Sequence, residues 1–193
     1  MKLGLRIVCR YIDQLWCQAI VIFLFEEDLI FTGHLQKLNN KLGGHLTLLK
    51  EKSFLTGKKG EVMLIAPQNR INSDKLLTIG LGHAGNWSLG HSSDVVLKAS
   101  TTIDQLNLSD ILIIMPSVIK KKTDYYALMK SIIHNLVEHY YREKGNTMEF
   151  FLKVVFLIEE HYLNNLKSLE KELRSYLNPI IDCSIIIDNR TGY

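Results

Sequence analysis

The stretch Leu76-Leu-Thr-Ile-Gly80-Leu-Gly82-His-Ala-Gly85-Asn-Trp87-Ser-Leu-Gly90 carries the strongest indication of fold in this chain. Its apolar start, residues 76–79, predicts a buried strand, and the glycines that follow predict a sharp turn. Apolar residues at helical spacing continue over residues 88–108, so the turn leads from a strand into a helix. Repetition of that unit is typical of parallel α/β sheets.

The same glycines spell G-x-G-x-x-G, the pattern of loops that hold the phosphates of dinucleotides on free amides and a helix dipole. That fingerprint also needs an acidic residue at the end of the next strand, whereas Asp104 falls inside the predicted helix. A structural turn is therefore the first interpretation and a ligand loop the alternative. The residues predicted to bind a nucleotide-type ligand are Gly80, Gly82, His83, Gly85, Asn86 and Trp87, with Trp87 stacked on a base.

The remaining chain alternates predicted strands and helices without a linker or a repeat. Further strands are expected at residues 3–11, 18–25, 61–66, 111–115, 154–157 and 183–188. Further helices are expected at residues 33–50, broken around Gly43-Gly44, at 123–144, capped by Thr123 and stopped by Gly145-Asn146, and at 164–177. Residues 56–60 have turn composition, so strands on either side would form a hairpin. The pattern predicts a single α/β domain over residues 1–193 with a largely parallel sheet between helices.

Composition excludes several classes of protein. The 193 residues are 47% hydrophobic, which favours a folded globular chain. Basic and acidic residues number 23 and 20, too even for a nucleic-acid surface, and the one tight basic run, residues 120–122, is expected to be a solvated loop. Cys9, Cys17 and Cys183 lack metal-ligand spacing, which favours reduced thiols. Without a signal-peptide pattern or an apolar run long enough to span a bilayer, we expect a cytoplasmic protein with no membrane partner.

No catalytic or metal site emerges from the sequence. His134 and His139 flank Glu138 on a predicted helix, but five residues rotate about 500°, which leaves the two rings about 140° apart. We expect a surface histidine pair there. The acidic trio at residues 26–28 is expected to be a solvated turn rather than an acid/base pair. Nucleophile elbow, Walker loop, CxxC and zinc-protease motifs are missing from the sequence, so no catalytic residue, metal or cofactor is predicted.

Three segments in order resemble the N-terminal domain of the leucyl (cytosol) aminopeptidase family. Residues 19–28 match its apolar strand that runs into acidic residues. Residues 75–82 match its strand that ends in Gly-Leu-Gly, and Lys98-Ala99 match a basic residue and an alanine in the next helix. The hairpin between them corresponds to Phe54, Gly57, Lys58, Gly60 and Glu61. The resemblance is specific over about residues 18–107.

The resemblance implies a three-layer α/β/α sandwich with a mixed, largely parallel sheet, similar to macro domains, whose strand-end loops bind ADP-ribose. It also implies a non-catalytic domain that packs on a catalytic domain and helps to build a hexamer. The family's catalytic domain holds two metals and carries an Asn-Thr-Asp-Ala-Glu-Gly-Arg motif, which this sequence lacks together with any cluster of carboxylates to hold metals. We therefore expect no peptidase activity from this chain alone.

Two functions follow as expectations. The first is a stand-alone, non-catalytic domain that acts by self-association or with a separately encoded protein, because apolar surface that normally faces a catalytic domain needs cover. The alternative is a macro-like module that binds a nucleotide or an ADP-ribose-type ligand at the loop of residues 80–87.

Overall fold

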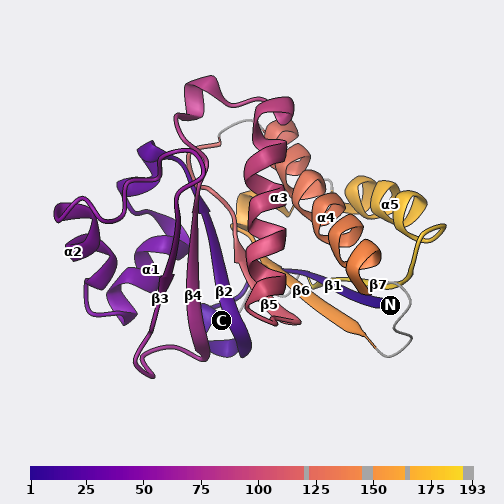
Figure 1. Ribbon diagram of the computed structural model, residues 1–193, viewed down its shortest axis with the longest axis horizontal. Helices are drawn as coiled ribbons and strands as arrows, with labels where there is room; N and C mark the ends of the chain where they lie inside the picture. The colour runs from indigo at the N-terminus through magenta and orange to yellow at the C-terminus, as the bar shows by residue number, and fades with distance from the viewer. Residues whose placement is uncertain (120–121, 145–149, 164–165, 189–193) are drawn as a thin grey trace.

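The computed structural model describes residues 1–119, 122–144, 150–163 and 166–188. A seven-stranded sheet in the order β3-β4-β2-β5-β6-β1-β7 runs through the molecule (Figure 1). All neighbouring strands are parallel except β3 and β4, which confirms the mixed, largely parallel sheet. The strands are β1 Lys2–Val8, β2 Cys17–Leu24, β3 Val62–Ile65, β4 Ser73–Gly80, β5 Asp110–Ile114, β6 Phe151–Leu157 and β7 Asp182–Asp188.

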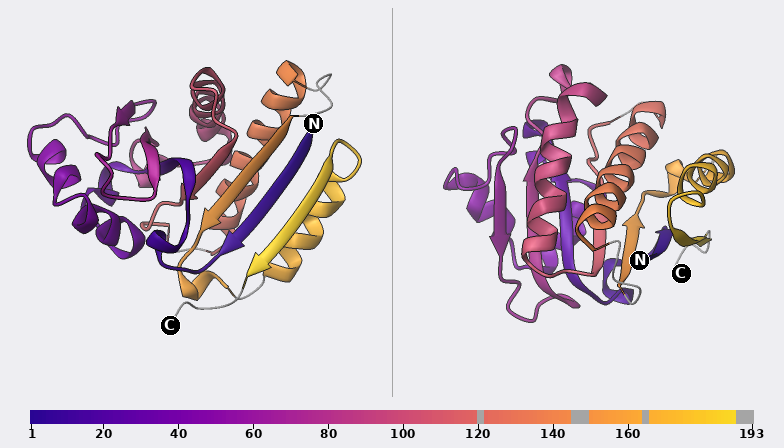
Figure 2. Two further views of the ribbon diagram at one scale, coloured as in Figure 1. Left: turned by 90° about the horizontal axis from the view of Figure 1, so that it is seen from below. Right: turned by 45° about the vertical axis from the view of Figure 1, so that its right-hand side comes forward.

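Helices cover both faces of the sheet and complete the predicted α/β/α sandwich. The helices are α1 Gly33–Lys41, α2 His45–Glu51, α3 Leu89–Gln105, α4 Lys122–Lys144 and α5 Leu166–Leu177. The pair α1 and α2 packs on one face, and α3, α4 and α5 pack on the other (Figures 1 and 2). Short 3-10 turns lie at Ile12–Gln14, Glu26–Leu29, Ala84–Asn86 and Glu160–Tyr162.

Strand β2 explains why two helical layers form. Successive side chains of a strand point to opposite faces, and both sets in β2 are apolar. Phe23 and its neighbours at alternate positions enter the core beneath α3 and α4, while Ile22 and its set enter the core beneath α1 and α2. Both side chains are 1% exposed. The run that the sequence predicts as a strand buried on both faces is therefore the central divider of the molecule.

The predicted hairpin around residues 56–60 is wrong. The Glu61 carboxylate accepts hydrogen bonds from the amides of Thr56 and Gly57, at 3.0 and 3.3 Å, so the chain closes on itself before β3 begins. Strand β3 instead pairs with β4 through a turn in which the Arg70 amide donates to the Pro67 carbonyl. The glycine-rich composition serves a close backbone contact rather than a strand connection.

That contact lies at the end of β4. The Gly80 amide donates to the Glu61 carbonyl at 2.8 Å, and the Gly60 amide donates to the Gly80 carbonyl at 2.9 Å. A Cβ atom on Gly80 would overlap the Lys58 carbonyl oxygen and lie 2.8 Å from the carbonyl carbon of Gly57. Gly80 is therefore required because another backbone occupies the space of a side chain.

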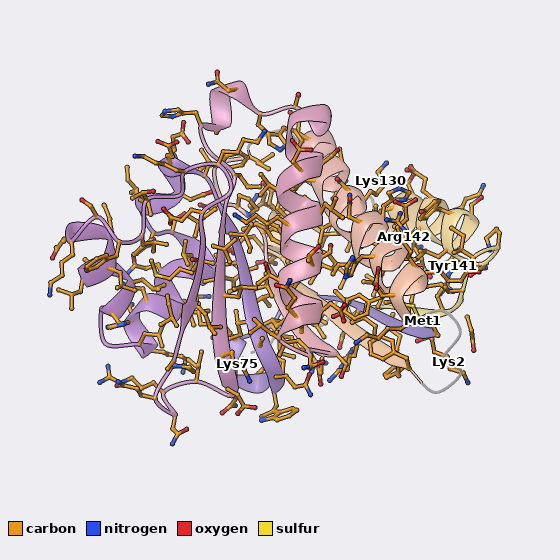
Figure 3. The ribbon with its side chains drawn as sticks, in the orientation of Figure 1. Met1, Lys2, Lys75, Lys130, Tyr141 and Arg142 are labelled. Carbon is orange, nitrogen blue, oxygen red and sulfur yellow. The ribbon has the colours of Figure 1, made fainter. Side chains whose placement is uncertain are left out.

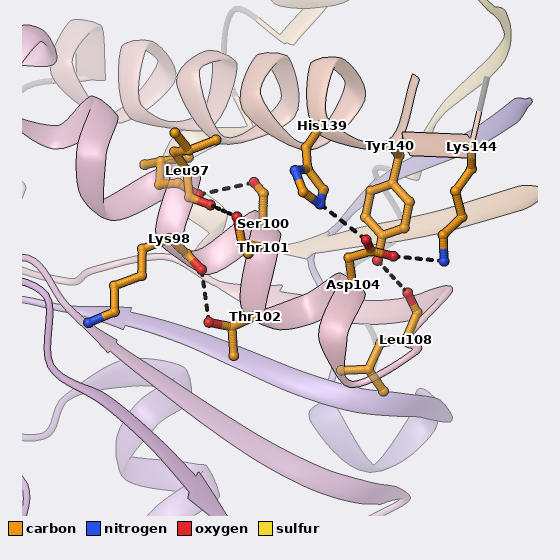
Figure 4. A network of polar contacts seen from close by, with 11 residues as sticks. Leu97, Lys98, Ser100, Thr101, Thr102, Asp104, Leu108, His139, Tyr140 and Lys144 are labelled. Carbon is orange, nitrogen blue, oxygen red and sulfur yellow. Dashed lines mark hydrogen bonds and ion pairs between the residues drawn. The ribbon is translucent and has the colours of Figure 1, made fainter. Parts of the chain in front are cut away.

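Helices α3 and α4 are joined by a polar network around Asp104 (Figure 4). Its carboxylate lies 3.2 Å from Nε2 of His139 and 2.7 Å from Nζ of Lys144. Next to them, the Tyr140 hydroxyl donates to the Leu108 carbonyl at 2.8 Å. Burial raises the pKa of Asp104, but the hydrogen bonds from Lys144 and His139 outweigh it, so the pKa is lowered overall.

This network corrects the predicted surface histidine pair. The side chain of His139 is only 12% exposed, whereas His134 is 44% exposed, lies 3.4 Å from Glu138 and contacts the ring of Tyr176. The two ends of helix α4 also need comment. Helix α4 begins at Lys122, so Thr123 lies in its first turn rather than at the cap, and residues 120–121 and 145–146 lie outside the described residues.

We expect Asp104→Asn to destabilise the fold by about 1–2 kcal/mol at neutral pH, because it removes a partly buried ion pair. A lowered pKa means that the stabilisation is present above the unfolded value of about 3.9 and is lost as the pH falls through the folded value. Urea unfolding of both proteins at several pH values measures this, and the difference should vanish in acid. The control is Glu172→Gln, which breaks an exposed ion pair between α5 and Lys130 of α4 and should change stability little. Figure 3 labels Lys130 on α4.

We expect Gly80→Ala to cost about 3 kcal/mol of folding free energy, because the added methyl group collides with backbone that cannot move aside cheaply. The matched control is Gly85→Ala in the same turn, where an added Cβ meets nothing within 4 Å. Chemical denaturation compares the two variants. Equal stability of both would contradict the close backbone packing at the end of β4.

Candidate functional site

The sheet topology fixes where a site can form. Strand β2 leads to α1 and α2 on one face, while its parallel neighbour β5 leads to α4 on the other. Two adjacent strands whose connections leave toward opposite faces open a crevice beyond their carboxyl ends. This switch point is where open α/β sheets bind ligands. On its other side β2 borders β4, which leads to α3 on the same face as α4, but there the Leu81 amide donates to the Leu24 carbonyl and the Glu26 amide donates to the Gly82 carbonyl.

A crevice of about 210 Å³ lies at this switch point, and we call it the switch-point crevice. It is smaller than the roughly 300–1,000 Å³ of pockets for drug-sized molecules, which suits a small ligand. The loops after β2, β5 and β6 and the start of α1 surround it. Its polar lining consists of Asp28, Thr32, His34, Ser117, Glu159 and His161, and its apolar and aromatic lining includes Phe23, Met115, Tyr125 and Tyr162.

Asp28 joins the loops after β2 and β5. Its side chain is 1% exposed, and Oδ1 accepts from the amide and hydroxyl of Ser117 at 2.9 and 2.8 Å and from the Val118 amide at 3.0 Å. Its Oδ2 accepts from the Phe25 amide at 2.8 Å. Burial raises the pKa of Asp28, and these hydrogen bonds oppose the rise. The prediction that residues 26–28 form a solvated turn is therefore wrong for Asp28.

Glu159 joins the loop after β6 to the start of α1. Its Oε1 accepts a hydrogen bond from the His34 amide at 2.8 Å. This amide lies at the N-terminal end of α1, where the helix dipole stabilises a negative charge. A Cβ atom on Gly33 would overlap the same carboxylate, and Gly33 has a φ of +54°. Glycine therefore begins α1 because Glu159 occupies the adjacent space.

Two stacked tyrosines form the aromatic wall of the crevice. The ring centroids of Tyr125 and Tyr162 are 3.7 Å apart, and the planes differ by 9°. The Tyr162 hydroxyl donates to the Ile119 carbonyl, and the Tyr126 hydroxyl donates to the Tyr162 carbonyl at 2.6 Å. Burial raises the pKa of both Tyr125 and Tyr162, so both are neutral phenols at physiological pH.

Most amides of the predicted ligand loop already have acceptors within the chain. The Gly80 amide is bonded as described above, the Leu81 amide donates to the Leu24 carbonyl at 2.9 Å, and the Gly82 amide donates to the Gly57 carbonyl at 2.9 Å. The Ala84 amide donates to the Glu27 carboxylate at 3.0 and 3.2 Å. Burial raises the pKa of Glu27, but the hydrogen bonds from the Ala84 amide, its own amide and His83 together outweigh burial, so the pKa is lowered overall.

The six predicted ligand residues lie in different environments. Gly80 and Gly82 are buried, whereas Gly85 and Asn86 are exposed. The ring of His83 is 62% exposed and lies 3.4 Å from Glu26 and 3.5 Å from Glu27. Trp87 packs against the core, and its Nε1 is buried without a hydrogen-bond partner. Ligand binding by these residues stays a prediction.

Helix α3 follows the glycine turn as predicted and begins at Leu89, one residue after the predicted start. The 3-10 turn Ala84–Asn86 separates Gly82 from α3, so the first turn of that helix lies away from the glycines. Among the described residues, no group of three or more His, Cys, Asp or Glu side chains is placed to hold a metal ion. Within the same residues, no helix has the length and apolar character needed to cross a membrane.

The chain was compared with known proteins. Residues 21–146 match the model of the cytosol aminopeptidase family, N-terminal domain. A probable cytosol aminopeptidase of Pseudomonas syringae pv. tomato is 23% identical over 123 residues, which cover 64% of this chain and 25% of that protein.

Two solved structures share the fold. A tomato leucine aminopeptidase mutant has a TM-score of 0.58 at 13% identity. The match covers 81% of this chain and 32% of the aminopeptidase chain. The Oceanobacillus iheyensis macrodomain with ADP has a TM-score of 0.56 at 18% identity. The match covers 91% of this chain and 92% of the macrodomain chain. This chain therefore spans a quarter to a third of the aminopeptidases that it matches and nearly all of a macrodomain. It belongs to the cytosol aminopeptidase family, as a form of its N-terminal domain with a macrodomain-like fold.

Proposed function

We propose that this chain is a non-catalytic binding domain whose ligand site is the switch-point crevice. The observation that carries the proposal is the position of that crevice between the carboxyl ends of β2 and β5, with the polar side chains of Asp28, His34 and Glu159 in its lining. The macrodomain with ADP supports it, because a protein of this fold holds a small molecule. The name of the Pseudomonas relative supports a place in the cytoplasm.

The family match supports a non-catalytic role for these residues. It covers the N-terminal domain, and the relatives contain a further two thirds or more of chain beyond what aligns here. Peptide hydrolysis by two metals needs a cluster of carboxylates, and the carboxylates of the crevice are bonded to backbone amides instead. Their observed role is to hold the loops that shape the site.

Between the two possible ligand positions, the crevice is the better one. At the loop of residues 80–87, the amides of Gly80, Gly82 and Ala84 donate to acceptors of the same chain. A phosphate there would have to displace the Glu27 carboxylate. The crevice has room for a ligand without breaking any backbone contact.

Amide NMR spectra with a panel of small neutral, cationic and anionic compounds test the site. We expect at least one compound to shift the signals of Gly33, Ser117 and Glu159 and to leave those of Ala84 and Asn86 unchanged. Thr32→Tyr at the mouth of the crevice should abolish these shifts, whereas a tyrosine at Gln36, on the exposed side of α1, should not. If no compound in the panel perturbs the crevice, the ligand site is refuted.

A second function, self-association, is favoured by one open surface. Helices α4 and α5 cover one side of β6, β1 and β7 (Figure 2), and the other side carries Phe151 and Ile186, each 51% exposed. The Phe151 ring lies over Gly4, where an added Cβ would come within 2.7 Å of it. Exposed apolar side chains on a sheet face are typical of a protein interface.

For this second function, we expect size-exclusion chromatography with light scattering to show a species larger than the monomer. Changing Phe151 and Ile186 together to threonine should shift the protein to the monomer, because the apolar contact is lost. Leu97→Thr is the control, since Leu97 is 46% exposed on α3. A wild-type monomer at every concentration would exclude self-association.

A further inference from the structure

Two side chains that line the switch-point crevice, those of His34 and Glu159, offer hydrogen-bond acceptors. Nε2 of His34 lies 3.0 Å from the Ile158 carbonyl oxygen, and because a carbonyl only accepts, Nε2 carries the proton. In the neutral ring, Nδ1 is then an acceptor. This atom is buried without a hydrogen-bond partner, and the side chain of His34 is only 7% exposed. A buried acceptor without a donor destabilises the empty site.

Glu159 supplies a second free acceptor. Its Oε1 is used by the His34 amide, but among the described residues no donor reaches Oε2. The side chain is 33% exposed and lines the crevice, so this oxygen can receive a hydrogen bond from a ligand.

The donors that face the Asp28 carboxylate are already used. The amides of Phe25, Ser117 and Val118 and the Ser117 hydroxyl all donate to Asp28. A phosphate only accepts hydrogen bonds at its ionised oxygens, so it could bind these amides only by displacing a buried carboxylate. The Asp28 carboxylate thus occupies the position at which these amides could otherwise bind an anion.

The negative charge of the crevice lining also disfavours the binding of an anion. Asp28 and Glu159 both line it, and within the part of the chain that the structure describes no lysine or arginine does. Arg10 and Lys37 line a neighbouring hollow of about 150 Å³, which shares His34 and Glu159 with the crevice. There Arg10 pairs with Asp188 and Lys37 lies 5.0 Å from the ring centre of Tyr11.

Building on the proposed function, we propose that the switch-point crevice binds a small cationic ligand that donates N–H hydrogen bonds, such as an amidinium or a primary ammonium, and rejects phosphate esters. The ligand donates to Oε2 of Glu159 and offers a donor to the unpartnered Nδ1 of His34. Its positive charge offsets the two carboxylates that the fold places there.

Calorimetry and amide NMR with benzamidine, its anionic counterpart benzoate, inorganic phosphate and ADP-ribose test this on the full chain. We expect benzamidine to bind at least about tenfold more tightly than benzoate and to shift the signals of His34 and Glu159. Glu159→Gln keeps the acceptor for the His34 amide but removes the charge, so it should weaken benzamidine about tenfold. The matched control is Glu160→Gln, which removes the same charge from an exposed neighbour outside the crevice and should leave binding unchanged.

The outcomes separate this inference from the proposed function. Shifts in the crevice caused by phosphate or ADP-ribose, or equal binding of benzamidine and benzoate, would overturn the cationic ligand and leave the crevice as the site. Binding of benzamidine that is insensitive to Glu159→Gln would overturn it as well. If none of the four probes binds, the cationic ligand is refuted, whereas the proposed function falls only if the wider panel also leaves the crevice unperturbed.

Discussion

The hydrogen bonds of the Asp28 carboxylate hold together the part of the structure on which the site depends. Strands β2 and β5 are neighbours whose connections leave toward opposite faces, so nothing in the backbone ladder links the loops beyond their ends. Asp28 makes that link by accepting from Phe25 on one side and from Ser117 and Val118 on the other. This buried carboxylate holds the two loops in fixed positions, and these loops form two sides of the crevice.

Other carboxylates repeat the arrangement around the same end of the sheet. Glu159 binds the first turn of α1, Glu27 binds the Ala84 amide, and Glu61 binds the amides of Thr56 and Gly57. Backbone amides at strand ends are ready-made positions for anions. In this chain the anions are side chains, so the fold uses for its own stability the donors with which a related fold could bind a phosphate. That difference gives the crevice its acidic, acceptor-rich character.

The sequence predicts the layers of this fold well because burial of strands and helices leaves a periodic pattern. The β2 run and the spacing of the apolar residues in α3 and α4 were sufficient to predict the sandwich. The predicted hairpin fails because Gly57 and Gly60 do not connect two strands: a Cβ atom on Gly57 would meet the Phe25 backbone, and the missing side chain of Gly80 lets this segment approach β4. A single sequence does not distinguish a glycine required by its own turn from one required by a distant neighbour.

The candidate site was harder to predict for a related reason. Asp28 follows two glutamates and resembles a solvated turn, and its burial depends on Ser117, which lies 89 residues away. Likewise, Glu159 contacts an amide 125 residues away in the sequence. The one usable indication was position, since Asp28 follows the central strand at its carboxyl end, where α/β sheets gather polar residues. The G-x-G-x-x-G pattern drew attention to a neighbouring turn whose amides serve the fold.

A high-resolution crystal structure of the protein soaked in parallel with benzamidine and with ADP-ribose tests the central claim most directly. The account predicts benzamidine in the switch-point crevice, within hydrogen-bond distance of Glu159, with Asp28 still bonded to the amides of Ser117 and Val118. It predicts no phosphate at these amides in the ADP-ribose soak. A phosphate group seated on the Ser117 and Val118 amides, with the Asp28 carboxylate displaced, would contradict it.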